Sequence, residues 1–277
     1  MVKAIQIKYD SPETVFRYAA KAGYTHVGIS FGDVPVFLED AWEQSVLRIR
    51  RHLDTFGLQC VQTHLPYYYL KLSSDILDPD MDESILRCIQ ATAMLGAKYA
   101  AMHLRTATDH DYSRTLSYED NKKAICTCLP VLESSGVVLA LENLPIFPGD
   151  HKKRLYSWDY EDLCQLVDFF ASDYVKICWD FGHAHLTGLN QIRALECIGD
   201  RLVCTHIHNN YGNGDQHLLP AFGTIQWKSI LPTLRKIRYQ GPLTLETVLD
   251  PDALESYMAY SYQSISYIEQ QIGEERV

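Results

Sequence analysis

The chain reads Val175-Lys-Ile-Cys-Trp-Asp180-Phe-Gly-His183-Ala-His185 over one stretch, which begins as an apolar strand and ends on a carboxylate and two histidines. A second apolar run, Leu202 to Thr205, ends on His206-Ile-His208 and continues into the loop Asp215-Gln-His217. Charged and imidazole side chains are poor choices for packing at the ends of buried strands, because an unpaired buried charge is costly. They are good ligands for a cation. The stretch therefore predicts a metal site where two strands end.

Short apolar runs alternate with longer amphipathic runs on both sides of this stretch, a pattern typical of βα units around a parallel sheet. Eight units fit the chain, with strands expected near residues 4–8, 26–30, 59–63, 98–102, 137–141, 175–180, 202–205 and 242–245. The fourth helix is expected over 118–134 and the seventh over 225–237. Eight consecutive units fit a closed barrel better than an open sheet, and no glycine-rich dinucleotide motif follows the first strand. The prediction is an α/β protein, a single (β/α)₈ TIM barrel over residues 1–277.

Composition narrows the class of protein. The chain has 277 residues, of which 47% are hydrophobic and 22% charged, and a net charge of −10. This balance is typical of globular proteins, and it disfavours attraction to nucleic acid. Without a signal-like start or a long apolar run, we expect no membrane partner and a cytoplasmic location. The eight cysteines are expected to be reduced core residues, since Cys126-Thr-Cys128 lacks the usual zinc-knuckle spacing.

The strand ends of such a barrel converge on one mouth, where active sites are built. Carboxylates and imidazoles stand at these ends or in the loops that follow, namely His64, His103, Glu142, Asp180, His183, His206, Asp215, His217 and Glu246. Taken singly, His64 or His103 could be a hydrogen-bonded barrel histidine, and Glu142 or Glu246 a helix cap or a rim charge. Several carboxylates at one mouth need a counter-charge, however, and Arg105 is the only cation near those strand ends. The set therefore predicts a bound divalent cation.

The ligand types restrict the metal. Glu, Asp and His without a thiolate suit Mn²⁺, Zn²⁺, Co²⁺ or Mg²⁺ rather than a structural cysteine-type zinc site. The spacing Asp180-x-x-His183 lets both side chains point into the mouth, Asp180 as a ligand and His183 as a second ligand or a substrate contact. His185 and His208 are expected to face helices or the substrate.

The motifs in order carry a family resemblance. They are Leu-Glu142-Asn, Trp-Asp180-Phe-Gly-His183, Thr-His206-Ile-His-Asn, Asp215-Gln-His217 and Leu-Glu246-Thr. Together they resemble the xylose isomerase-like TIM-barrel superfamily, which contains sugar and sugar-phosphate isomerases and epimerases and also the endonuclease IV family of abasic-site nucleases.

The resemblance implies a sugar isomerase or epimerase in which Glu142, Asp180, His206 and Glu246 hold one divalent metal. It also implies that Glu142 and Glu246 act as acid and base, moving a proton through a metal-stabilised cis-enediolate. His183 would contact the sugar, and we expect His64, His103 and Arg105 to line the same substrate site. The partner would be a small-molecule sugar, phosphorylated or not. Proteins of this group often form dimers or tetramers, so a homo-oligomer is one open outcome.

The endonuclease IV branch is the alternative. Its proteins hold three zinc ions with nine ligands, and the nine carboxylates and histidines at this mouth match those positions by type. His64, His103, His183, Asp215 and His217 would then be further metal ligands. Against this, Ala221-Phe222-Gly223 stands where the endonucleases have Gly-Glu-Gly, and no extended basic surface follows His64 or His103. A barrel that binds metal without catalysis, or a lyase or dehydratase acting on another substrate, is a third reading.

Overall fold

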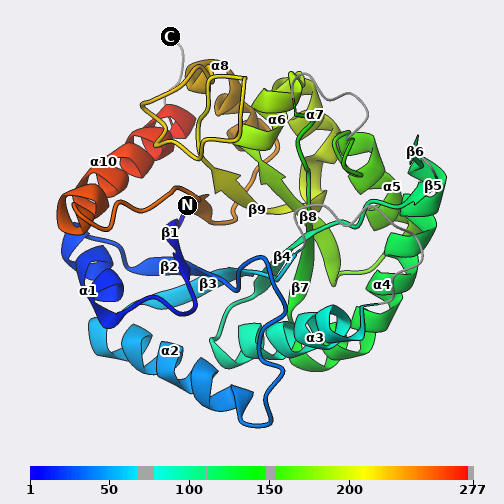
Figure 1. Ribbon diagram of the computed structural model, residues 1–277. Helices are drawn as coiled ribbons and strands as arrows, with labels where there is room; N and C mark the ends of the chain where they lie inside the picture. Colours follow the sequence, from blue (N-terminus) through cyan, green and yellow to red (C-terminus); the bar gives the residue numbers. More distant parts are fainter. Residues whose placement is uncertain (68–77, 110, 148–153, 274–277) are drawn as a thin grey trace.

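The computed structural model describes residues 1–67, 78–109, 111–147 and 154–273. Within these ranges, eight parallel strands close into a barrel in the order β1-β10-β9-β8-β7-β4-β3-β2 (Figure 1). The barrel strands are β1 (Lys3–Lys8), β2 (His26–Ser30), β3 (Gln59–His64), β4 (Tyr99–His103), β7 (Val138–Glu142), β8 (Val175–Asp180), β9 (Leu202–Ile207) and β10 (Leu243–Leu245). The predicted (β/α)₈ barrel is confirmed.

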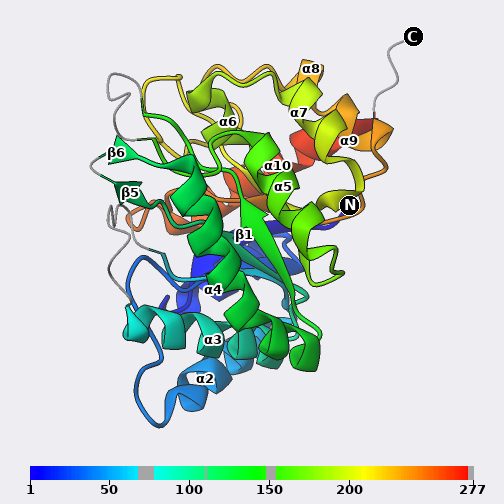
Figure 2. The ribbon, with the colours of Figure 1, turned by 90° about the vertical axis from the view of Figure 1, so that its right-hand side faces the viewer.

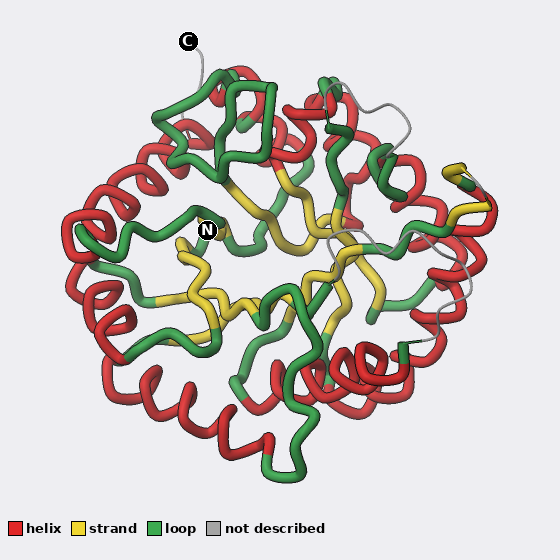
Figure 3. Tube along the Cα trace, viewed as in Figure 1, coloured by secondary structure: helices red, strands yellow, loops and turns green. Residues whose placement is uncertain are grey.

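Helices surround the strands, as the red ring around the yellow barrel shows (Figure 3). They are α1 (Glu13–Ala22), α2 (Trp42–Phe56), α3 (Pro79–Met94), α4 (Arg114–Ser135), α5 (Tyr160–Phe170), α6 (Phe181–Thr187), α7 (Gln191–Ile198), α8 (Trp227–Ile230), α9 (Pro232–Lys236) and α10 (Leu254–Gly273). A short hairpin of β5 (Thr108–Asp109) and β6 (Asp111–Tyr112) projects at the end of the barrel where β4 finishes (Figure 2). None of the described helices combines the length and apolarity needed to cross a membrane.

The main core lies between the sheet and the helices. Strand side chains such as Ile5, Ile7 and Ile29 are fully buried there against helix residues such as Phe16. The inside of the barrel is narrower, and small side chains fill part of it: Ala101, Ala140, Cys178 and Cys204 form a separate buried cluster. Side chains along each strand alternate between the helix layer and the barrel interior. The inward-facing residues at the C-terminal ends of the strands can therefore form a site.

Three local differences from the sequence expectation have physical causes. Helix α4 begins at Arg114 because the Ser113 side chain accepts a hydrogen bond from the Leu116 backbone N–H, which caps the helix earlier. The seventh helix is split into α8 and α9, because Pro232 lacks the N–H that would continue the first segment. Asp180 caps an additional helix, α6, directly after β8.

The cysteines are all free, but Cys126 and Cys197 are exposed. The expectation that every cysteine belongs to the core is therefore wrong at these two positions. Both lie on the outer helices α4 and α7, away from the strand ends.

Candidate metal centre

The strand ends bring the predicted residues to one mouth. His64, His103, Glu142 and Asp180 are the last residues of β3, β4, β7 and β8, while Glu246 directly follows β10. Strand register makes neighbours of them, since His103 pairs with Glu142 and Asp180 pairs with His206 across adjacent strands. All nine predicted ligands fall into groups whose ligand atoms lie within 4.8 Å of one another.

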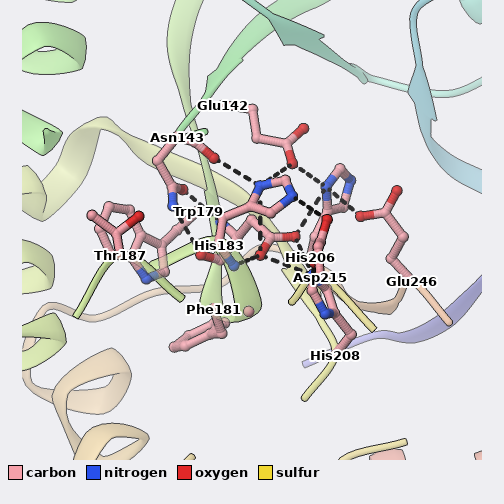
Figure 4. A network of polar contacts seen from close by, with 12 residues as sticks. Glu142, Asn143, Trp179, Phe181, His183, Thr187, His206, His208, Asp215 and Glu246 are labelled. Carbon is pink, nitrogen blue, oxygen red and sulfur yellow. Dashed lines mark hydrogen bonds and ion pairs between the residues drawn. The ribbon is translucent and has the colours of Figure 1, made fainter. Parts of the chain in front are cut away.

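One such group contains Glu142, Asp180, His206 and Glu246. The Nδ1 atom of His206 lies 3.0 Å from Oε1 of Glu142, 3.2 Å from Oε2 of Glu246 and 4.0 Å from Oδ2 of Asp180. Figure 4 shows the His206 ring between the two glutamates. Glu142, Asp180 and His206 are fully buried. Three carboxylates around one imidazole leave excess negative charge even when that imidazole is protonated, so the group favours a cation.

The charges around Glu142 and His206 shift the pKa values of both groups. Burial would raise the pKa of Glu142, but His206 and His103 outweigh it and hold that pKa well below its usual value. Burial would lower the pKa of His206, and Glu142 and Glu246 instead raise it to about 10. In the metal-free protein His206 is therefore an imidazolium, and a metal that binds it must displace a proton.

A second group consists of His64, His103 and Glu142. The Nε2 atoms of His64 and His103 lie 3.3 Å and 3.5 Å from Oε2 of Glu142. Burial lowers the pKa of His103 below its usual value, although the neighbouring Glu142 acts to raise it. The Tyr67 ring packs 4.2 Å from the ring centre of His103 and 5.0 Å from that of His64. Glu142 thus offers one oxygen to each of the two groups.

A third group joins His183, His208, Asp215 and His217. Oδ2 of Asp215 lies 3.3 Å from Nε2 of His183 and 3.1 Å from Nε2 of His217. These two imidazoles hold the pKa of Asp215 below its usual value against the effect of burial. Burial is also outweighed at His217, whose pKa rises to about 9 beside Asp215 and Glu246.

His208 lies inside this third group, whereas from the sequence we expected it to face a helix or the substrate. Its Nε2 is 3.1 Å from the Asp180 carboxylate, and its ring stacks 4.0 Å from that of His217. Gly182 makes this possible, because a side chain there would overlap the His208 ring. The glycine of the motif Trp-Asp-Phe-Gly-His was the feature of the sequence that could have indicated this position of His208.

Two other residues lie outside the groups. The Nε2 atom of His185 is 2.7 Å from Oγ1 of Thr224, and His185 is partly exposed. Arg105 pairs with Asp82 of α3, and its backbone N–H donates to Asn121 of α4. Among the described residues, the Arg105 guanidinium thus pairs with Asp82 on α3, and its expected contact with the substrate stays a prediction.

Three histidines are oriented by backbone carbonyls. Nδ1 of His64 lies 2.8 Å from the Leu65 carbonyl, Nδ1 of His183 lies 2.9 Å from the Asn143 carbonyl, and Nδ1 of His217 lies 2.9 Å from the Glu246 carbonyl. A carbonyl only accepts, so each Nδ1 carries a proton, and Nε2 is the nitrogen that faces the mouth and could bind a metal once it carries no proton. Metal-binding histidines typically have this arrangement.

Unpaired atoms give a test of whether a metal fits. Among the described residues, Nε2 of His64, Oε2 of Glu142 and Oδ1 of Asp215 are buried and make no hydrogen bond, although the first two atoms lie 3.3 Å from each other. Such atoms are costly unless something binds them. Carboxylate oxygens and imidazole nitrogens of this kind fit a divalent cation.

Asn143 is a buried residue that was not among the candidates from the sequence. Its side-chain amide donates to the Asp180 carbonyl at 2.9 Å and accepts from the Asp180 N–H at 2.7 Å. This pair of bonds connects the ends of β7 and β8, and the Asn143 carbonyl also orients His183. Its position directly after Glu142 in the Leu-Glu-Asn motif was the feature of the sequence that could have indicated a role at the site.

Comparisons with known proteins agree with this architecture. Residues 16–265 match the model of a family described as xylose isomerase-like TIM barrel. The uncharacterized protein y4fM of Sinorhizobium fredii is 31% identical over 181 residues, which cover 62% of this chain and 54% of that protein. The D-psicose 3-epimerase of Enterocloster bolteae is 34% identical over 115 residues, which cover 41% of this chain and 35% of that protein. The matched parts thus span about half or less of these relatives' lengths.

Solved structures are similar over nearly the whole chain. A D-tagatose 3-epimerase-like protein has a TM-score of 0.79 at 19% identity, covering 99% of this chain and 98% of that one. A D-psicose 3-epimerase determined in the presence of D-fructose has a TM-score of 0.77 at 14% identity, covering 99% of this chain and 100% of that one. At these identities the likeness shows a shared fold.

Proposed function

The chain belongs to the xylose isomerase-like TIM barrel family, and we propose that it is a divalent-metal-dependent isomerase or epimerase of a sugar or sugar phosphate. The epimerase relative and the sugar epimerases among the similar structures support an enzyme of this kind. One observation carries the proposal: Glu142, Asp180, His206 and Glu246 form one group, in which the two glutamates lie on either side of the imidazole.

The four residues of this group would hold the ion through carboxylate oxygens and the Nδ1 atom of His206. A divalent ion held there would polarise a substrate carbonyl and so acidify the neighbouring C–H bond. Glu246 is the most accessible of the four, with a side chain 16% exposed against 0% for Glu142. We therefore assign proton removal to Glu246 and proton return to Glu142, which must first take up a proton from water because it is ionised in the free protein. Return to the same carbon from the other face would invert it, and return to the neighbouring carbon would exchange ketose and aldose.

The remaining imidazoles would bind substrate hydroxyls. His103 and His217 have side chains 17% and 21% exposed, so they can contact a molecule in the mouth. His183 and Asp215 form a hydrogen-bonding pair beside them. In this proposal the third group is a polar wall of the sugar site.

Deuterium incorporation tests the proposal directly. The protein loaded with Mn²⁺, Co²⁺ or Mg²⁺ is incubated in D₂O with a panel of ketoses and ketose phosphates, and mass spectrometry detects deuterium beside the carbonyl. We expect incorporation into at least one sugar, and its loss in Glu246→Gln. Incorporation that persists in Glu246→Gln would remove this residue from the mechanism, and a panel without incorporation would count against the function.

A multinuclear hydrolase of the endonuclease IV kind is the second candidate, because the three groups overlap. Glu142 belongs to both of the first two groups, and Asp180 contacts His208 of the third. Such sharing suits several metal ions close together. Three zinc ions per chain together with nicking of DNA at abasic sites would favour this candidate, whereas one metal ion per chain with deuterium incorporation would favour the isomerase.

A further inference from the structure

Gln6 is an amide inside a barrel strand, β1. β1 alternates, and its Ile5 and Ile7 are fully buried in the core beneath the helices. Gln6, between them, is on the opposite face of the strand. The register of β1 and β10 pairs Ile5 with Leu245, so the next residues along the two strands, Gln6 and Glu246, lie side by side.

The Gln6 side chain contacts the accessible carboxylate of the site. Its Nε2 donates to Oε1 of Glu246 at 2.6 Å. The other oxygen, Oε2, lies 3.2 Å from Nδ1 of His206. The two oxygens of Glu246 therefore have separate partners, and Oε2 is the one that faces the four-residue metal group.

The chemistry of the donor matters. An amide is neutral, so it can orient the carboxylate and still leave the full negative charge for a cation, whereas a lysine or arginine would neutralise it. A hydrogen bond to the ionised form also favours that form. An amide at this position thus suits a carboxylate that must remain an anion in one orientation.

Packing does not explain the amide. Among the described residues, Oε1 of Gln6, both amide atoms of Gln62 and Oγ1 of Thr244 are buried without hydrogen-bond partners. A methyl group on Gly28 would meet the Thr244 side chain at 3.3 Å and that of Gln62 at 3.5 Å, so these residues are close neighbours. An apolar residue would fill the space at position 6 without an unpaired polar atom, so the hydrogen bond to Glu246 is what an amide adds there.

We propose that Gln6 is a positioning residue, which holds Oε1 of Glu246 so that Oε2 points to the metal and the substrate. This inference rests on the proposed metal-dependent function. It assigns Gln6 no direct contact with the reacting atoms.

Metal binding by the whole chain tests the inference without a known substrate. Mn²⁺ affinity is measured by titration calorimetry for the wild type, Gln6→Met and Gln6→Asn. Methionine keeps the length but cannot donate, while asparagine keeps the amide but is too short to reach Glu246. Gln62→Met is the matched control, since it removes another buried amide of the barrel interior. We expect Mn²⁺ to bind roughly 10- to 100-fold more weakly to both Gln6 variants and with little change to the control.

Two further readouts separate positioning from loss of structure. The visible absorption of bound Co²⁺ reports ligand geometry, and we expect it to change in the Gln6 variants and not in Gln62→Met. In a Glu246→Gln background, Gln6→Met should have no further effect on Mn²⁺ affinity, because the oriented carboxylate is already gone. Where Gln6→Met fails to fold, Gln6→Asn serves in its place.

Unchanged Mn²⁺ affinity and Co²⁺ absorption in a folded Gln6 variant would overturn the inference while the proposed function stands. An equal loss in the wild-type and Glu246→Gln backgrounds would overturn it as well. A wild-type protein that binds no divalent metal would instead refute the proposed function, and the inference with it.

Discussion

Replacing Gly182 by alanine tests how the third group is built. Gly182 is a buried residue in the first turn of α6. An added Cβ would lie 1.9 Å from Cε1 and 2.3 Å from Nδ1 of His208, far inside normal contact distance. The His208 ring cannot withdraw freely, because its Nε2 contacts the Asp180 carboxylate at 3.1 Å and its ring stacks 4.0 Å from His217.

The size of the effect follows from two opposing contributions. Forcing extra volume into a packed interior typically costs about 1–3 kcal/mol and occasionally more. Alanine in place of glycine within a helix returns up to about 1 kcal/mol. Since the His208 ring cannot withdraw freely, we take the packing cost at its upper end, about 3 kcal/mol. Gly182→Ala should then lower the free energy of unfolding by about 2–3 kcal/mol, which lowers the melting temperature by roughly 4–12 °C for a chain of this size. Because the ring is pushed from Asp180, metal affinity should fall as well.

The assay is thermal and urea unfolding of the metal-free protein, followed by a double-mutant cycle with His208→Ala. Removing the ring removes the clash, so in that background Gly182→Ala should be neutral or stabilise by up to about 1 kcal/mol. An equal loss of stability in both backgrounds, or none in the wild-type background, would refute the placement of His208.

Three more outcomes are expected. Asp180→Ala should weaken metal binding by at least roughly 10- to 100-fold, because that is the loss typical of removing only a hydrogen-bond partner of a ligand. Unchanged metal content would mean that the site is wrongly located. Mn²⁺ affinity should rise from about pH 6 to about pH 9, by up to tenfold per unit, because the raised pKa of His206 (about 10) keeps this ligand protonated until the metal displaces its proton. Affinity that is flat over this range in calorimetry would contradict this protonation state. Asn143→Leu should lower the free energy of unfolding by about 1–3 kcal/mol, because it leaves the Asp180 N–H without its partner and removes one of the donors to the Asp180 carbonyl. Asn121→Leu on α4 is a comparison outside the metal groups.

The barrel and the nine candidate ligands could be predicted from residue order, because the signals are local. Alternation of apolar runs with amphipathic runs identifies strands and helices, and each ligand stands where an apolar run ends. In a parallel barrel every such position opens on the same mouth, so a list of strand ends is already a list of neighbours. His103 and Glu142 are an example, adjacent in register though they lie on different strands.

Only the tertiary structure determines into which metal-binding groups these residues fall and which neighbouring residues orient them. The split of Glu142 between two groups, the place of His208 under Gly182 and the pairing of Arg105 with Asp82 depend on distances between elements remote in the chain. The same holds for Gln6 and Glu246, which are 240 positions apart and meet only because the barrel closes between β1 and β10. Hydrophobic periodicity specifies which face of an element is buried, whereas register and closure determine which buried polar atoms meet.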